Sequence, residues 1–257
     1  MDSLRILLTN DDGIHAMGLC ALYEALFSKG FHVDVVAPDS ERSAVGHAIT
    51  LSDPIKIKEV YRLGDRFGWA INGTPADCVK IAVNALLEAR PNVVVSGINR
   101  GSNTGINILY SGTVSAATEA AILGIPSIAV SVDSFSDQDY CFAAFFVSEL
   151  VSRLVKYEDS CKSLNVNIPA IPAHLIRGVK LVRQCNSPFK ERFEKRVDPR
   201  GNIYYWQCSS DFDWEKAKGT DIYWLKKGYI TVTPIKFDLT DEQCLEETSI
   251  LLSDILS

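Results

Sequence analysis

Two neighbouring carboxylates follow the first predicted strand and could bind a metal ion. Residues 10–13 read NDDG and come directly after the apolar run 4–9, so Asp11 and Asp12 lie at a strand end. Adjacent carboxylates repel each other unless a cation lies between them or one is protonated. Oxygen ligands of this kind suit Mg²⁺ or Mn²⁺. An ordinary Asx turn before a helix is the alternative, and turn preferences favour it for an isolated Asp-Asp pair.

A stretch rich in glycine and asparagine offers a place for an anion. Every second residue from 97 to 107 is Gly or Asn, which gives flexible backbone and amide side chains. The stretch continues through residues 111–115, SGTVS, into a predicted helix whose first N–H groups favour a phosphate. Its length exceeds what a simple connection requires. The alternative is a long turn in which Ser111 or Thr113 is an ordinary N-cap.

Several common catalytic and nucleotide-binding motifs are absent. The sequence contains no GxxxxGK[ST], GxGxxG, HExxH or GxSxG, and residues 9–13 lack the Asp-x-Asp spacing of haloacid-type phosphatases. His15 and His47 lie near the predicted site without a paired ligand spacing, so zinc bound by imidazole is not expected. The aromatic and basic stretch 189–206 could stack a base, but packing of an arm explains it better.

The composition is that of an ordinary globular protein. The chain has 257 residues, 47% hydrophobic and 23% charged, which suits one large domain or a domain with an appendage. Its net charge of −6 argues against a basic face for duplex nucleic acid. The N-terminus lacks the apolar run of a signal peptide, and no stretch reaches eighteen apolar residues, so we expect no membrane contact. Seven widely spaced cysteines indicate reduced thiols and a cytoplasmic protein.

Strands and helices must alternate to position these polar segments. We expect strands at 4–9, 33–37, 93–95 and 127–132, and helices at 17–28, 75–87, 113–123 and 142–155. This order predicts an α/β fold with a Rossmann-like, mostly parallel sheet and helices on both faces. Residues 39–73 are expected to form short extended pieces outside the main sheet. Ligands bind beyond the carboxyl ends of parallel strands, where residues 10–13, 38–43 and 96–101 would meet.

The last third of the chain is less regular and is typical of an arm. We expect strands at 165–168, 179–183 and 230–235, a turn at 198–202 and a helix at about 241–252. Three of the four tryptophans, Trp206, Trp214 and Trp224, fall here, and so much aromatic surface requires a partner. We predict a single domain over 1–257, with a catalytic core to about residue 185. A C-terminal β-hairpin and helix oligomerisation arm would follow over about 186–257.

Five motifs in order resemble those of the SurE survival-protein family of metal-dependent nucleotidases. They are TNDDG at 9–13, AP at 37–38 with RS at 42–43, NGTPAD at 72–77, SGINRG at 96–101 and YSGTV at 110–114. A looser similarity continues to residues 228–234. The resemblance implies a 5'-nucleotidase that also removes 3'-phosphates and trims short polyphosphate. It further implies a homodimer or homotetramer whose C-terminal arms are exchanged between subunits.

The resemblance also implies roles for single residues. One divalent cation per subunit, Mg²⁺ or Mn²⁺, would be held by Asp11, Asp12, Ser43 and Asn99. The phosphate of a nucleoside monophosphate would be bound by Asn103, Ser111, Gly112 and Thr113.

Asp11 and Asp12 are the expected catalytic residues, and two routes stay open for Asp11. It orients or deprotonates the attacking water, or it attacks phosphorus itself. Two other functions also stay open. One is a nucleotide-binding sensor without turnover, and the other is a phosphatase for a different small phosphoester.

Overall fold

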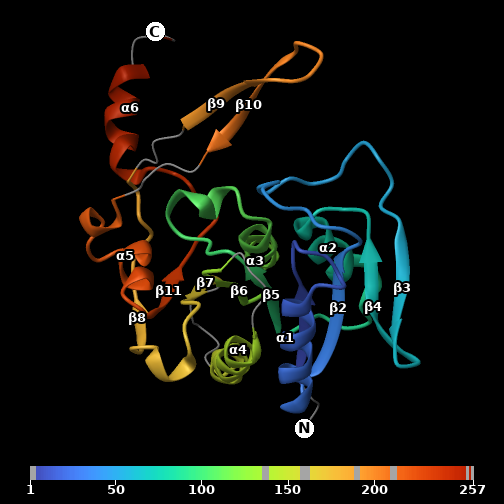
Figure 1. The fold of residues 1–257 in the computed structure, drawn as a ribbon. Helices are drawn as coiled ribbons and strands as arrows, with labels where there is room; N and C mark the ends of the chain where they lie inside the picture. The colour runs from blue at the N-terminus through green and yellow to red at the C-terminus, as the bar shows by residue number, and fades with distance from the viewer. Residues whose placement is uncertain are drawn as a thin grey trace.

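A nine-stranded sheet forms the centre of the molecule, and a separate two-stranded hairpin stands beside it (Figure 1). The computed structural model describes residues 4–134, 139–156, 163–187, 192–208, 213–252 and 255. The strands are β1 (Arg5–Thr9), β2 (His32–Pro38), β3 (Ile57–Arg62), β4 (Asp65–Ile71), β5 (Val93–Arg100), β6 (Ser127–Val132), β7 (Ser163–Ile168), β8 (Val179–Leu181), β9 (Arg192–Val197), β10 (Ile203–Cys208) and β11 (Ile230–Pro234). The α-helices are α1 (Met17–Ser28), α2 (Pro75–Ile81), α3 (Gly112–Ile122), α4 (Cys141–Leu154), α5 (Asp221–Lys226) and α6 (Leu245–Leu252). The order in the sheet is β3-β4-β2-β1-β5-β6-β7-β11-β8.

Six neighbouring strands make the parallel part of this sheet. β1 lies between β2 and β5, β4 lies beyond β2, and β6 and β7 follow β5, all in the same direction. α1 and α4 cover one face of these strands, and α2 and α3 cover the other. The Rossmann-like α/β fold predicted from the sequence is confirmed. None of the helices in the described part of the chain has the length and apolar character that a membrane span requires.

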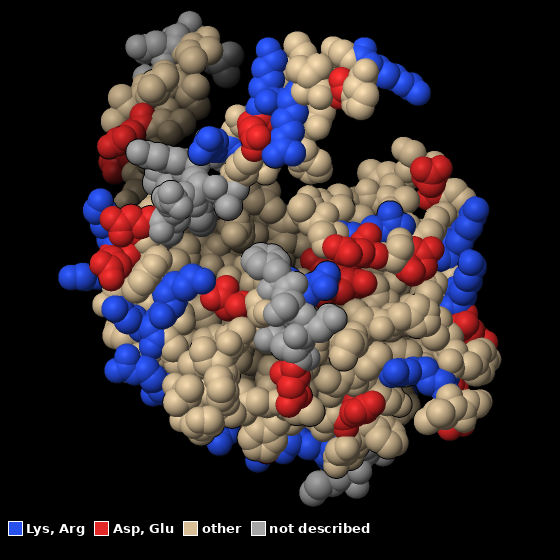
Figure 2. All heavy atoms as spheres, in the orientation of Figure 1, with Lys and Arg blue, Asp and Glu red and all other residues tan. Residues whose placement is uncertain are grey.

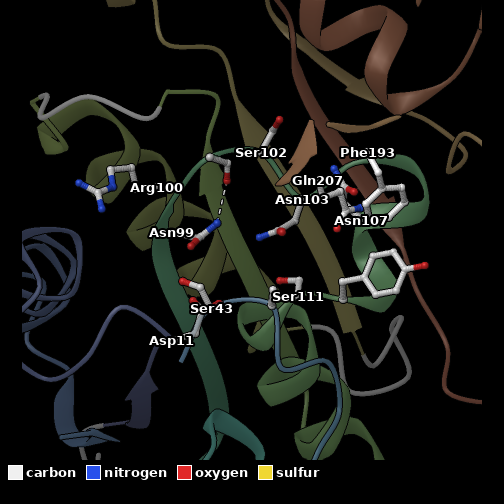
Figure 3. A pocket seen from close by; sticks show the side chains of 13 residues that line it. Asp11, Ser43, Asn99, Arg100, Ser102, Asn103, Asn107, Ser111, Phe193 and Gln207 are labelled. Carbon is white, nitrogen blue, oxygen red and sulfur yellow. Dashed lines mark hydrogen bonds between the residues drawn. The ribbon is translucent and has the colours of Figure 1, made fainter. Parts of the chain in front are cut away.

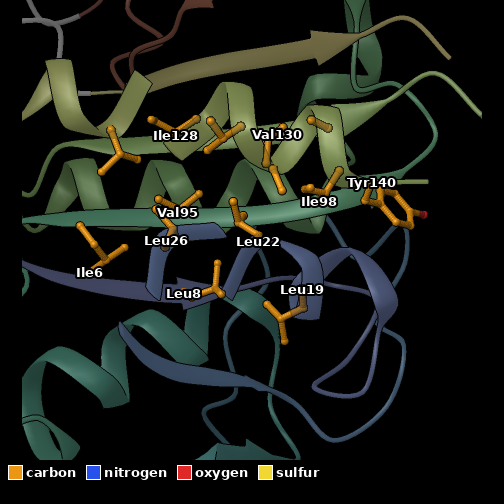
Figure 4. Close-up of a cluster of buried hydrophobic side chains, with 14 of the residues drawn as sticks. Ile6, Leu8, Leu19, Leu22, Leu26, Val95, Ile98, Ile128, Val130 and Tyr140 are labelled. Carbon is orange, nitrogen blue, oxygen red and sulfur yellow. The ribbon is translucent and has the colours of Figure 1, made fainter. Parts of the chain in front are cut away.

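Alternate residues of each central strand supply the two cores. Ile6 and Leu8 of β1 pack against α1 in the larger core, which Figure 4 shows. Leu7, between them, packs with Val79 of α2 on the opposite face. Because both faces are covered, the polar groups of the strands meet solvent only at the strand ends.

Capping side chains fix the start of the two helices on the second face. The Thr74 hydroxyl accepts from the Asp77 N–H at 3.1 Å, and the Asp77 carboxylate accepts from the Thr74 N–H at 2.9 Å. This capping box, with Pro75 next in the chain, confirms the predicted helix start. Ser111 caps α3 by accepting from the Val114 N–H at 3.1 Å.

The extended pieces expected within residues 39–73 do not lie outside the main sheet, and that prediction was wrong: residues 57–62 and 65–71 are two of its strands. β3 and β4 pair antiparallel, and β4 joins β2 in parallel through the register Val36 to Trp69 and Ala37 to Ala70. Gly68 allows this close approach, because a Cβ at that position would overlap the carbonyl oxygen of Val35. The sheet therefore extends two strands further than the sequence pattern indicated.

Residues 97–100 are not a loop, which corrects a second expectation. β5 continues to Arg100 after its register with β6 shifts between Ser96 and Asn99. Asn99 pairs with Ser131, and Arg100 with Val132. Gly97 has φ +134° and lies close to β6, which only glycine tolerates at this point. Asn99 is thus held by a strand.

The main sheet also continues past the expected arm boundary near residue 185. β11 pairs antiparallel with β7 and parallel with β8, so it belongs to the body of the molecule. Trp224 stacks edge-on against Tyr229 within the same chain, and Trp214 joins a small core with Ile222. Trp206 is 58% exposed, and it is the one of these three tryptophans that its own chain leaves mostly uncovered.

Two elements stand away from the body: the hairpin β9–β10 and the helix α6 (Figure 1). The residues of β9 are exposed along its whole length, and no residue of α6 is buried. The hairpin turns at residues 198–202, where Asp198 accepts the N–H groups of Arg200 and Asn202 at 2.8 Å each. The hairpin and terminal helix expected from the sequence are therefore present.

Candidate functional site

A pocket of about 600 Å³ opens at the carboxyl ends of the central strands, as expected for this fold (Figure 3). Five of the eight residues predicted from the sequence line it: Asp11, Ser43, Asn99, Asn103 and Ser111. The other lining residues are Ala44, Arg100, Gly101, Ser102, Asn107, Tyr110, Phe193 and Gln207. The three remaining predicted residues, Asp12, Gly112 and Thr113, lie one or two positions in the chain from a lining residue. The fold has thus brought together the segments that follow β1, β2 and β5.

Asp11 is a buried carboxylate at the end of β1, with 4% of its surface exposed. The Thr113 hydroxyl donates to its Oδ1. Burial raises the pKa of Asp11 above its ordinary value, although the hydrogen bonds from Thr113 act in the opposite direction. A Cβ at Gly112 would lie only 2.8 Å from the Asp11 Cβ, so glycine allows α3 to begin against this carboxylate.

Asp12 is half-buried, and the negative charge of Asp11 disfavours its ionised form. Burial, followed by the negative charge of Asp11, raises the pKa of Asp12 to about 6. The backbone N–H and the charge of Arg100 act in the opposite direction. Two carboxylates in these surroundings bind either a proton or a cation more readily than an exposed pair would.

Ser43 and Asn99 bring neutral oxygens to the same pocket. The Ser43 hydroxyl donates to the Glu41 carboxylate at 2.7 Å, which leaves its lone pairs as acceptors. The Asn99 Nδ2 donates to the Gly101 carbonyl at 2.7 Å, so the amide oxygen is the atom left to bind a cation. In the described part of the chain, no three His, Cys, Asp or Glu side chains gather closely enough to hold a metal. A cation site on Asp11 and Asp12 would need neutral donors such as these two.

Buried amides beneath the pocket hold Asn103 in place. Its Nδ2 donates to Ser131 Oγ, and its backbone N–H donates to Asn167 Oδ1, both at 2.8 Å. The carbonyl of Asn103 accepts from the Nδ2 atoms of Asn165 at 2.7 Å and Asn167 at 3.1 Å. The sequence analysis did not identify these two asparagines of β7. Their one signal in the sequence is the presence of amide side chains in an otherwise apolar strand.

A second set of hydrogen bonds fixes Gly105, in the loop that carries Asn103. The Gly105 N–H donates to the buried Asp221 carboxylate at 2.9 Å, and Gln184 Nε2 donates to the Gly105 carbonyl at 2.8 Å. Asp221 also accepts from the Cys185 N–H at 2.9 Å. The loop that lines the pocket is therefore fixed from β7, from the first residue of α5 and from the segment after β8.

His47 lies outside the lining of the pocket, and its ring is held by contacts elsewhere. Its Nε2 lies 2.8 Å from Glu119, and Lys80 Nζ lies 3.0 Å from the same carboxylate. His15 is exposed. The contact between His47 and Glu119 ties the segment that carries Ser43 to α3.

Phe193 and Gln207 reach the pocket from the hairpin, and sequence reasoning did not place them there. They are separated from the other lining residues by more than eighty positions in the chain. The aromatic and basic composition of this stretch was the only signal, and it fits arm packing as well as binding.

Comparison with known proteins identifies the family. Residues 6–191 match the family model described as Survival protein SurE. A protein from Syntrophobacter fumaroxidans named 5'-nucleotidase SurE is 51% identical over 95% of this chain and 97% of its own length. One of the same name from Syntrophus aciditrophicus is 47% identical over 97% of this chain and 94% of its own. The crystal structure of SurE protein from Aquifex aeolicus superposes with a TM-score of 0.84 at 40% identity, covering 96% of this chain and 99% of that one. The chain belongs to the SurE family.

Proposed function

We propose that the protein is a divalent-metal-dependent 5'-nucleotidase, which hydrolyses nucleoside monophosphates to nucleoside and phosphate. The adjacent carboxylates Asp11 and Asp12, at a pocket that also presents neutral polar side chains and Arg100, carry the proposal. Relatives at 44–51% identity over most of the chain bear the name 5'-nucleotidase SurE, which supports the same activity here. Hydrolysis of 3'-nucleotides and of short polyphosphate is part of the proposal.

The residues of the pocket fit a hard divalent cation, Mg²⁺ or Mn²⁺. Asp11 and Asp12 would supply two carboxylates, Ser43 a hydroxyl and Asn99 an amide oxygen, all ligands that such cations prefer. Burial raises the pKa of both carboxylates, so their ionised forms are disfavoured without a positive charge beside them, which a cation would supply. When bound, the ion supplies charge neutralisation for the phosphate ester and acidifies water.

The phosphate would be bound by the start of α3 and the loop before it. α3 begins at Gly112, directly after Ser111 in the pocket, so the positive end of its helix dipole would favour an anion there. Asn103 would add an amide donor, and the Thr113 hydroxyl keeps the Asp11 carboxylate in a fixed orientation. Arg100 lines the same pocket and compensates the charge of an anionic substrate.

Asp11 would have the central chemical role. Its buried carboxylate would orient the attacking water and accept the proton, or it would attack phosphorus directly. Either route requires Asp11 to be ionised and held still. The hydrogen bond from the Thr113 hydroxyl holds the carboxylate in place and partly offsets the effect of burial on its pKa. Acid quenching of a single turnover with ³²P-labelled AMP distinguishes the two routes, because attack by Asp11 leaves the label on the protein and direct attack by water does not.

Metal removal tests the proposal directly. Protein treated with EDTA and then dialysed is expected to lose nearly all hydrolysis of AMP and GMP, because Arg100 alone does not balance the two carboxylates and the phosphate. Addition of Mn²⁺ or Mg²⁺ is expected to restore it. Phosphate release is measured with each cation over a panel of nucleotides, polyphosphate and sugar phosphates. Full activity after EDTA treatment would rule out the metal role, and nucleotide binding without phosphate release would favour a sensor.

We also propose that the protein is a cytoplasmic homodimer or homotetramer joined through its arm. Leu251 of α6 is 76% exposed and Trp206 of the hairpin 58% exposed, and both need apolar cover. The described cysteines are free thiols, which suits a reducing compartment. Light scattering is expected to give two or four times the chain mass of 28.4 kDa. A monomer at micromolar concentration would contradict the exchanged arm.

A further inference from the structure

The hairpin β9–β10 borders the pocket on the side away from the carboxylates. Phe193 and Gln207 are directly paired across the two strands, so their side chains leave the same face of the hairpin. Figure 3 shows them together beside Asn107, away from Asp11 and Ser43. The pocket therefore has a polar end formed by the body and a second end formed in part by the hairpin.

The two ends differ in chemistry. Asp11, Asn99 and Ser111 offer only oxygen and nitrogen groups at the first end. At the second end Phe193 keeps 56% of its surface exposed, beside the amide of Gln207. A flat apolar ring next to an amide suits a heteroaromatic base, which has a π face and a hydrogen-bonding edge.

The charge of the hairpin suits an anionic ligand. Its basic residues are Arg192, Lys195, Arg196 and Arg200, against Glu194 and Asp198, so residues 192–208 carry +2 in a chain of net charge −6. Figure 2 shows these basic side chains gathered on the hairpin, which overhangs a hollow in the surface of the body. The pocket volume of about 600 Å³ is within the range of small-molecule sites and accommodates a nucleoside monophosphate.

We propose that the hairpin is the base-recognition element of this site. The ring of Phe193 stacks on the base of the bound nucleoside monophosphate, and the amide of Gln207 hydrogen-bonds to the edge of that base. This inference rests on the proposed nucleotidase function. It adds the residues that distinguish a nucleotide from a phosphate ester without a base.

The two residues make different contributions to specificity. Every base has a π face, so stacking on Phe193 strengthens binding of all nucleotides to a similar degree. The amide of Gln207 both donates and accepts, so its effect depends on the donor and acceptor pattern of each base. Phe193 thus favours nucleotides over phosphate esters without a base, and Gln207 determines which nucleotides bind more tightly than others.

The test compares substrates with and without a base. For the metal-loaded wild type, kcat/KM is measured on AMP, GMP, CMP, UMP and ribose 5-phosphate. Phe193→Ala is expected to lower the ratio of AMP to ribose 5-phosphate about tenfold, mainly through KM, as loss of one stacking contact predicts. Gln207→Leu is expected to change the ranking of the four nucleotides. Inhibition by adenosine is expected to weaken in Phe193→Ala, while inhibition by inorganic phosphate reports on the other end of the pocket.

Tyr204→Ala is the matched control, because Tyr204 pairs with Arg196 and leaves the opposite face of the hairpin. Its substrate ratio is expected to stay within about twofold of the wild type, since surface changes away from a site have small effects. Light scattering on all variants verifies that the assembly is unchanged. Equal ratios in Phe193→Ala, Gln207→Leu and the wild type would overturn the inference. A wild type that hydrolyses no nucleotide at all would instead refute the proposed function.

Discussion

Asp11→Asn is expected to lower the turnover of AMP about a thousandfold, equivalent to ~4 kcal/mol of transition-state stabilisation. The substitution keeps the size of the side chain and leaves an oxygen for the Thr113 hydroxyl, but it removes the charge that the proposed chemistry requires. Steady-state kinetics with saturating Mn²⁺ measure the loss. Asp53→Asn is the control, because Asp53 is exposed and outside the lining of the pocket, and it is expected to retain wild-type turnover.

Stability measurements separate a lost catalytic group from a damaged fold. The raised pKa of Asp11 means that its ionised form is disfavoured in the folded protein. A neutral amide removes this penalty, so metal-free Asp11→Asn is expected to unfold at the same temperature as the wild type or higher. Mn²⁺ is expected to raise the melting temperature of the wild type and to have little effect on the variant. A variant that keeps more than a tenth of the turnover, or the full Mn²⁺ shift, would show that Asp11 has been assigned wrongly.

Gly18→Ala is expected to destabilise the protein by about 3 kcal/mol, at the upper end of the cost of overpacking. In an exposed helix the same substitution would stabilise by up to ~1 kcal/mol, because alanine is the better helix former. In α1, however, a Cβ at Gly18 would overlap the carbonyl oxygen of Ile98. That carbonyl belongs to β5 in the middle of the sheet, so α1 has to move and the packing of Leu19 and Leu22 is lost.

Thermal unfolding measures this effect as a fall of roughly 6–12 °C, at 2–4 °C per kcal/mol for a chain of this size. Turnover is also expected to fall, because Ile98 precedes Asn99 at the pocket. The control is Gly30→Ala, where φ is +82° and no atom lies within 4 Å of the added Cβ, so backbone strain of ~1 kcal/mol is the main cost. If Gly18→Ala were as stable as Gly30→Ala, the close contact between α1 and β5 would be wrong.

Local signals in the sequence identified the central elements because they depend on neighbours along the chain. The apolar runs of β1, β2 and β6 and the capping box at Thr74 each lie within a few residues. The positions of Asp11, Ser43 and Asn99 followed from the rule that loops after parallel strands share one edge, together with the family resemblance. β3 and β4 were misjudged, because whether an extended segment joins a sheet depends on the space beside a distant strand, here opened by Gly68.

The sequence by itself determined the α/β class, the family and the chemical types of the residues near the pocket. Only the tertiary structure decided how these residues are supported and what surrounds them. Asn165 and Asn167 hold Asn103 from β7, and Asp221 holds Gly105 across more than a hundred positions. Phe193 and Gln207 reach the pocket only because the hairpin folds back over it. Such contacts depend on the distances between segments that are far apart in the chain. Those distances are set by the packing of the whole fold and cannot be inferred from residue type and local spacing.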